Sequence, residues 1–166
     1  MDDKGRTALW WAVEKNHEPM VILLLGAKDI KPNLKDNDDG MSPFLVAVKN
    51  GHVSMVDIFL RDTRIVWSSK DNDGRTPLSW AAGSGLEDVV RLLLTNNDIR
   101  VAIDSRDNTS HQTPLLWAAR KGHAKVVKLL LEKAASPNAT DLSDGRSALS
   151  WAAGNGHEET VALLLE

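Results

Sequence analysis

Gly74-Arg75-Thr76-Pro77-Leu78-Ser79-Trp80-Ala81-Ala82 is the stretch of sequence that decides the fold, because four related stretches occur elsewhere in the chain. They begin at Gly5, Gly40, His111 and Gly145. The hydroxyl residues of the five stretches are 35, 34, 37 and 34 residues apart, at Thr7, Ser42, Thr76, Thr113 and Ser147. A period of this length over nearly the whole chain indicates a repeat protein, in which each repeat is one supersecondary unit.

One repeat contains the signals for two helices and a turn. Thr76 can accept hydrogen bonds from the free N–H groups of an opening helical turn, and Pro77 suits the first helical position. Gly85 is placed to end this helix, and Val89–Leu94 supplies the apolar stripe of a second helix. The segment Asp71–Gly74 is typical of a tight, hairpin-type turn. Since one such unit cannot bury its apolar face alone, we expect the units to stack.

The succession Asp-Gly-Arg-Thr-Pro-Leu at 73–78, Ala-Ala at 81–82, Gly-His at 122–123 and Leu-Leu-Leu at 129–131 resembles the ankyrin repeat. The resemblance spans residues 5–166 and implies an all-α solenoid of helix-turn-helix units joined by hairpin-like fingers. We expect a single domain, 1–166, with repeats at roughly 3–35, 36–69, 70–106, 107–140 and 141–166, the last truncated. The Ser-Trp-Ala-Ala variant at 79–82 and 150–153 is similar to arrays of filamentous fungi, which often follow a NACHT-type signalling module.

The sequence also departs from the family pattern. The histidine that usually follows Thr-Pro-Leu is absent in all five repeats, where the position holds Trp10, Leu45, Ser79, Leu116 and Ser150. An insertion between Thr95 and Gln112 predicts a longer, more mobile finger in the fourth repeat. The array starts inside a finger and stops inside a helix, with no polar capping repeat, so we expect a segment of a longer multidomain protein.

The composition of the chain excludes several classes of protein. No apolar run approaches the ~20 residues of a membrane span, and the polar N-terminus is no secretory signal, so we expect no membrane insertion. The chain has no cysteine, which excludes disulfides and thiolate sites and favours an intracellular, cytoplasmic location. The net charge of −3 argues against a nucleic-acid binder. A remote alternative is a basic patch formed by Arg120, Lys121, Lys125 and Lys128.

No motif predicts catalysis or a ligand site. Four histidines (His17, His52, His123 and His157) share one repeat position, so stacking holds neighbours roughly 8–10 Å apart, too far for one zinc ion. We interpret them as turn residues. Gly83-Ser84-Gly85 lacks the lysine and the strand of a phosphate loop, and the turn at Gly74 lacks the carboxylates of a calcium loop. We therefore expect no metal, cofactor, small-molecule substrate or enzymatic activity in this segment.

Tryptophans mark the candidate binding face. Trp11, Trp80, Trp117 and Trp151 occupy one repeat position, and Val46 replaces the fifth. At ~100° per residue, Trp80 lies on roughly the opposite side of its helix from the apolar Leu78. The resemblance places the first helices on a concave surface, where an aromatic row is typical of binding hot spots. The predicted partner-binding residues are Trp11, Val46, Trp80, Trp117, Trp151, Lys49, Ser84, Arg120, Lys121 and Asn155.

These residues predict a protein-protein interaction module that binds another protein through its groove and finger tips. Small neighbours such as Ser84 and Asn155 should leave Trp80 and Trp151 the most accessible rings. The alternatives are indoles that pack between neighbouring helices and a solenoid that serves as a structural spacer between other domains. A further alternative is a catalytic or nucleotide-driven domain elsewhere in the same protein. Trp67 lies outside the row and is expected to pack on the next repeat, with contact to a partner as the alternative.

Overall fold

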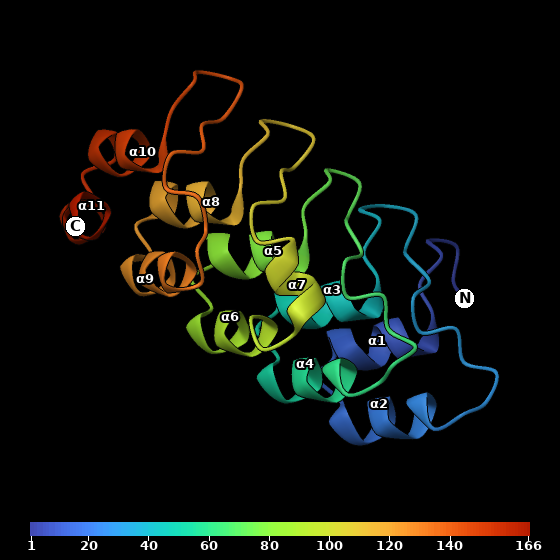
Figure 1. Cartoon of the computed structure of the whole chain (residues 1–166). Coiled ribbons are helices and arrows are strands. Elements are labelled where there is room, and N and C mark those ends of the chain that lie inside the picture. The colour runs from blue at the N-terminus through green and yellow to red at the C-terminus, as the bar shows by residue number, and fades with distance from the viewer.

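The computed structural model describes all 166 residues and consists of stacked helix pairs. The first helices of the pairs are α1 (Ala8–Glu14), α3 (Pro43–Lys49), α5 (Pro77–Gly83), α8 (Pro114–Lys121) and α10 (Ala148–Gly154). The second helices are α2 (Glu18–Leu25), α4 (Val53–Leu60), α6 (Glu87–Leu93), α9 (Ala124–Glu132) and α11 (Glu158–Leu165). Figure 1 shows the two rows of helices, with the fingers projecting beyond the row of first helices. The predicted all-α solenoid is confirmed.

The first helices begin where the sequence signals predict. In each repeat the hydroxyl of the Thr or Ser before the helix accepts a hydrogen bond from the backbone N–H three residues later. The bond from the Ser79 N–H to Thr76 Oγ1, for example, is 3.1 Å long. Where the family histidine is missing, Ser79 and Ser150 place their own hydroxyls 3.0 and 3.2 Å from Thr76 and Ser147. A second hydroxyl therefore replaces the family's imidazole in these two repeats.

The turns between the paired helices depend on glycine and histidine together. Gly85 and Gly122 both have positive φ, and the histidine rings of the next repeat, His123 and His157, lie directly against them. The Nε2–H of His123 donates to the carbonyl of Gly83 at 3.2 Å, and that of His157 donates to the carbonyl of Arg120 at 3.1 Å. The interpretation of the histidines as turn residues is confirmed, and the rings of His123 and His157 also bond one repeat to the next.

One continuous apolar core of 36 buried residues runs through the stack between the two rows of helices. Phe44 and Phe59 meet edge to face in it, with ring centroids 5.9 Å apart. No helix in the structure is both long enough and apolar enough to cross a lipid bilayer.

The insertion of the fourth repeat forms an additional helix, α7 (Asn97–Val101), so the prediction of a longer finger is wrong. The finger of this repeat closes with a backbone bond from Asp107 to Gln112, and it is as long as the finger from Asp36 to Met41. The extra residues instead place Ile99 in the core, where only 5% of its surface is exposed. An apolar side chain on a short helix thus turns the insertion into part of the stack.

Candidate functional site

Each finger starts with an aspartate that joins the finger to the first helix that follows it. In the third repeat, Asp71 Oδ1 accepts the backbone N–H of Arg75 at 2.7 Å, which closes the turn. The other oxygen of the same carboxylate, Oδ2, accepts the indole N–H of Trp80 at 2.8 Å. Asp71 is buried and Trp80 is half-buried. One carboxylate thus fixes both the shape of the finger and the position of an indole.

The same arrangement recurs along the array and forms what we call the indole row. The indole N–H to carboxylate distances are 3.1, 2.8, 2.8 and 2.7 Å for the pairs Trp11–Asp2, Trp80–Asp71, Trp117–Asp107 and Trp151–Asp141. The tryptophans that share a repeat position in the sequence therefore lie between the first helices and the fingers. Each ring has its polar edge turned to a finger and leaves its faces free for other contacts.

In the second repeat the indole comes from the preceding repeat. Val46 stands where the other repeats have tryptophan, and Trp10 of α1 donates to Asp36 Oδ2 at 3.1 Å instead. Trp10 thus completes the indole row, although it stands one position before the tryptophan position of the other repeats. Val46 is only 2% exposed, which leaves little of its side chain for a partner, and its role as a partner contact stays a prediction. With Met41 it lines a hollow of about 310 Å³ between the first helices and the fingers.

Burial and hydrogen bonds act in opposite directions on the finger aspartates. Burial alone would raise the pKa of Asp107, but hydrogen bonds from Ser110, Trp117 and Thr109 hold that pKa below its ordinary value. The pKa of Asp141 is lowered in the same way, against burial, by hydrogen bonds from Asp144, Trp151 and Arg146. Because the charged form is the better acceptor, both carboxylates are ionised at neutral pH.

Cations lie over the faces of the indoles and form what we call the cation row: Arg6, Lys49, Arg75, Arg120 and Arg146. In its central part the Arg75 guanidinium lies 4.9 Å from the Trp80 centroid and 4.4 Å from that of Trp117. The Arg120 guanidinium lies 5.7 Å from the Trp117 centroid and 4.4 Å from that of Trp151. Cations and indoles therefore alternate along the face, at distances where cation–π attraction acts.

The members of the cation row differ in their acidic partners. Arg6, Lys49 and Arg146 each lie within 4.0 Å of a carboxylate. Arg75 and Arg120 take part in none of the eight ion pairs of the structure, and neither guanidinium donates a hydrogen bond. The centre of the face therefore holds two cations that lie over aromatic rings and form no ion pair of their own.

Lys49, Ser84, Lys121 and Asn155 are exposed at the ends of the first helices or just beyond them. Trp11, Trp80 and Trp117 are half-buried.

Trp151 departs from the prediction that small neighbours leave it accessible. Its exposed fraction is only 8%, and it is the most buried member of the row. Arg120 and Arg146 stack on its ring, with their guanidinium carbons 4.4 and 4.7 Å from its centroid. These two long side chains cover the surface that the small neighbours leave open.

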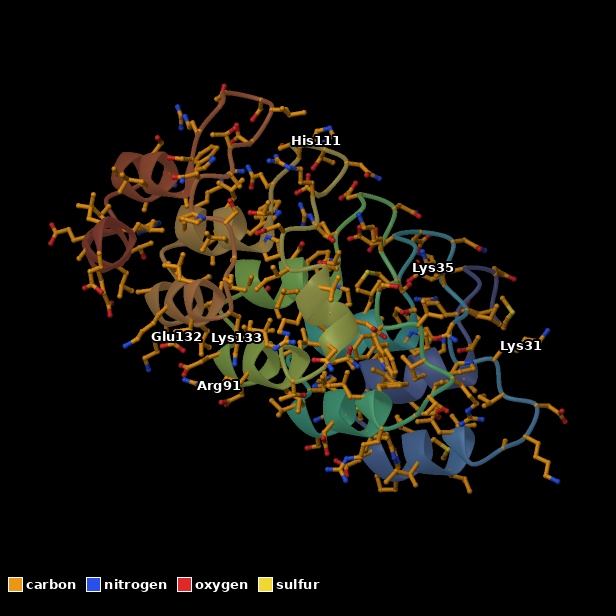
Figure 2. The ribbon with its side chains drawn as sticks, in the orientation of Figure 1. Lys31, Lys35, Arg91, His111, Glu132 and Lys133 are labelled. Carbon is orange, nitrogen blue, oxygen red and sulfur yellow. The ribbon has the colours of Figure 1, made fainter.

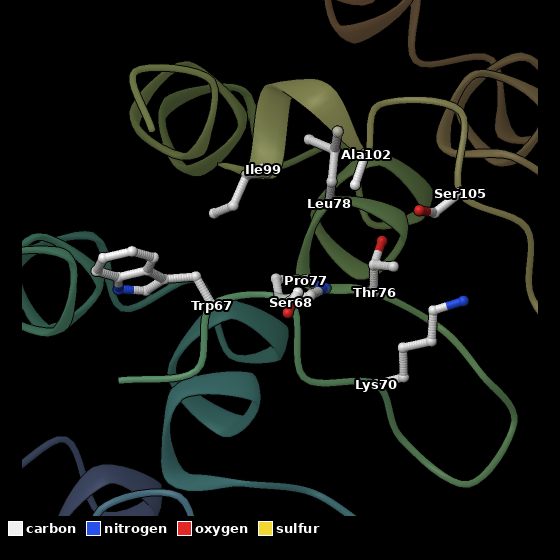
Figure 3. A pocket seen from close by; sticks show the side chains of 9 residues that line it. All are labelled: Trp67, Ser68, Lys70, Thr76, Pro77, Leu78, Ile99, Ala102 and Ser105. Carbon is white, nitrogen blue, oxygen red and sulfur yellow. The ribbon is translucent and has the colours of Figure 1, made fainter. Parts of the chain in front are cut away.

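Trp67 packs on the next repeat, as predicted. It is half-buried and lines a small cavity of about 70 Å³ with Leu78 of α5 and Ile99 of α7. Figure 3 shows Trp67 on the segment that leads into the third finger, and Ile99 above it on the helix formed by the insertion. The indole N–H of Trp67 has no hydrogen-bond partner, unlike those of the indole row.

The outer face, formed by the second helices, has a different character. Figure 2 shows Arg91, Glu132 and Lys133 on this side, while His111 lies on the opposite side, at a finger. The residues of the possible basic patch are divided between the faces, because Arg120 stacks on the indole row while Lys125 on α9 lies 3.7 Å from Glu87 of α6. They do not form one continuous basic surface.

Two family profiles match the chain. The profile described as ankyrin repeats (three copies) matches residues 29–107 and 99–166, and the profile of the single ankyrin repeat matches residues 4–37. An ankyrin repeat-containing protein of Schizosaccharomyces pombe is 30% identical over 95 residues. The alignment covers 56% of this chain and 40% of that relative, so the chain spans less than half the length of the curated protein it matches.

Proposed function

Because this chain belongs to the ankyrin-repeat family, whose repeats are in general protein-interaction modules, we propose that it binds an extended segment of another protein. The binding surface is the side of the first helices that carries the indole row and the cation row, which we call the concave face. The observation that carries the proposal is the alternation of half-buried indoles with cations along the first helices. Aromatic and arginine side chains are the residues most enriched in binding hot spots. The fingers flank this row and can contact the same partner.

The alternative functions have less support. A structural spacer would not require two guanidinium groups without an ion pair, since the partial desolvation of each group costs free energy. Nucleic-acid binding requires a continuous basic surface, which the division of the lysines and arginines between two faces does not offer. Members of the family are typically not catalytic, and we propose no catalytic role for this segment. The intracellular, cytoplasmic location stays a prediction.

Selection of peptides from a random displayed library tests the proposal and does not require the natural partner. The immobilised chain is compared with two variants that each add one indole at an exposed serine. Ser84→Trp obstructs the concave face, while Ser54→Trp places the same bulk on α4 of the outer face. Neither serine side chain makes a hydrogen bond in the structure, so both variants should fold.

We expect the selected peptides to bind the native chain and Ser54→Trp equally and to bind Ser84→Trp at least about tenfold more weakly, as loss of one hot spot does. Equal binding to both variants would exclude the concave face. Loss of binding in Ser54→Trp alone would move the site to the outer face, and a failure to enrich any peptide would favour the spacer.

A further inference from the structure

We propose that the segment bound by the concave face is acidic and presents a carboxylate at every third residue, one to Arg75 and one to Arg120. This inference rests on the proposed function and specifies the chemistry of the partner. It begins with the two guanidinium groups that stack on the indole row without an anion.

Stacking leaves the hydrogen-bonding edge of these guanidinium groups unused. The Arg75 guanidinium carbon lies over the rings of Trp80 and Trp117, and that of Arg120 lies over the rings of Trp117 and Trp151. Neither side chain donates a hydrogen bond in the structure, and the terminal nitrogens of each guanidinium group remain available to an acceptor, whereas Arg75 Nε is buried. A planar fork of donors matches a carboxylate, which it can bind with two parallel hydrogen bonds.

The surrounding structure holds these cations in place before a partner arrives. Arg75 follows a finger turn that Asp71 closes, and its Nε is buried. The ring of Trp117, which lies between the two arginines, is itself held by Asp107 through a 2.8 Å hydrogen bond. Two arginines restrained in this way lose less conformational freedom on binding than free surface side chains do.

A shared indole ring sets an upper limit on the distance between neighbouring cations. Arg75 and Arg120 lie 4.4 and 5.7 Å from the centroid of the same Trp117 ring, so their guanidinium carbons are at most about 10 Å apart. Arg120 and Arg146 share Trp151 in the same way, at 4.4 and 4.7 Å. A polyproline II segment rises about 3.1 Å per residue with three residues per turn, so every third side chain points the same way, about 9 Å further on. Its carboxylates can therefore follow the cation row.

Spaced carboxylates fit this face better than a nucleic-acid backbone does. The finger tips carry Asp38, Asp39, Asp73 and Asp144, all exposed beside the cation row. A strand with a phosphate at every nucleotide would meet these carboxylates as well as the arginines. A peptide with acids only at every third residue can place neutral side chains beside the finger tips.

Synthetic peptides test the inference by fluorescence anisotropy. The first labelled peptide carries Glu at every third position between Pro, Ala and Ser, the second has the same composition with its Glu residues contiguous, and the third has Gln in place of every Glu. Each is titrated with the native chain, with Arg75→Gln/Arg120→Gln and with Arg61→Gln/Arg100→Gln. The last variant removes the same charge from exposed positions outside the concave face.

We expect the first peptide to bind most tightly and the Gln peptide not to bind. A hydrogen bond to a charged group contributes about a factor of ten in affinity, so Arg75→Gln/Arg120→Gln should weaken binding by roughly a hundredfold, while the outer variant changes it by less than about threefold. Arg75→Lys/Arg120→Lys keeps the charge and should fall between these values because it loses the planar fork. Circular dichroism checks that each variant folds.

Several outcomes would overturn the inference. Equal affinity of the two double Gln variants would mean that only the net charge of the protein matters. Equal affinity of the spaced and contiguous peptides would exclude the requirement for a carboxylate at every third residue. Competition by duplex DNA at physiological ionic strength would point to a polyanion site. Library peptides that depend on the concave face but carry no acids would overturn this inference and leave the proposed function standing. A library without any such peptides would overturn both.

Discussion

The indole N–H of Trp10 donates to Asp36 Oδ2 at 3.1 Å, across the boundary between the first and second repeats. Everywhere else in the indole row the aspartate and the tryptophan belong to the same repeat. The exception coincides with Val46, which stands at the tryptophan position and cannot donate. Asp36 Oδ1 accepts from backbone N–H groups of its own finger, whereas Oδ2 obtains its donor from the neighbouring repeat, and this bond links the two repeats.

Trp10→Phe should lower the free energy of unfolding by about 1–3 kcal/mol, because it removes the indole donor of a buried carboxylate while an aromatic ring is kept. Trp67→Phe is the matched control, since it removes the same atoms from an indole whose N–H has no partner. Urea unfolding followed by far-UV circular dichroism measures both. If the two variants lost the same stability, the bond to Asp36 would contribute nothing net.

Ile99→Ala should destabilise the protein by about 2–5 kcal/mol, as truncation of a buried isoleucine usually does. The residue is 5% exposed on α7, so the loss would show that the insertion belongs to the folded core. Val101→Ala, on the same helix at 85% exposure, should change stability by less than about 0.5 kcal/mol. Thermal unfolding of both variants checks the pair, and equal stability of the two would mean that α7 does not contribute to the core.

The scaffold of this protein could be predicted from the sequence because its signals are local. Thr76 and Pro77 are adjacent, and each acts on the helix that begins there, so their meaning does not depend on the rest of the fold. The glycine at position 85 likewise adopts positive φ for the turn that it occupies. The repeat period then places the same local signals in all five repeats.

The contacts of the candidate site could not be predicted because they join separate elements. A helical wheel indicates which face of a helix Trp80 occupies, but its bond to Asp71 depends on how the finger folds back. Trp10 stands one position before the tryptophan position of the other repeats, so the periodic pattern of the row does not relate it to Asp36. The helix α7 has only five residues, too few for an apolar period to appear.

Stability should fall with acidity as the finger aspartates become protonated. The pKa of Asp107 lies below its ordinary value of about 4, against the effect of burial, because Ser110, Trp117 and Thr109 donate hydrogen bonds to the carboxylate. The unfolded chain therefore takes up the proton first as the pH falls. The contribution is fully present above about pH 4 and is lost as the pH falls through the lowered folded-state pKa.

Asp107→Asn tests this dependence. The amide cannot accept on both sides, so we expect a loss of about 1–3 kcal/mol at neutral pH. Urea unfolding at a series of pH values should show that the difference between the native chain and the variant shrinks below about pH 4, where the native carboxylate also loses its charge. A difference that stays constant down to strongly acidic pH would contradict this account of Asp107.

Two glycine substitutions should have opposite effects. Gly85 has φ +68°, and a Cβ added there would lie 2.6 Å from Nδ1 of His123, so Gly85→Ala requires both backbone strain and a shift of that ring. Residues held at such a φ cost about 1–3 kcal/mol, and the bond from His123 to the carbonyl of Gly83 would be disturbed as well.

Gly154 is a residue of α10 with no atom within 4 Å of an added Cβ. Gly154→Ala should therefore stabilise the protein by about 0.5–1 kcal/mol, since alanine favours the helix. Thermal unfolding measures both stability changes. An unchanged midpoint temperature of unfolding for Gly85→Ala would show that the turn does not confine the ring of His123.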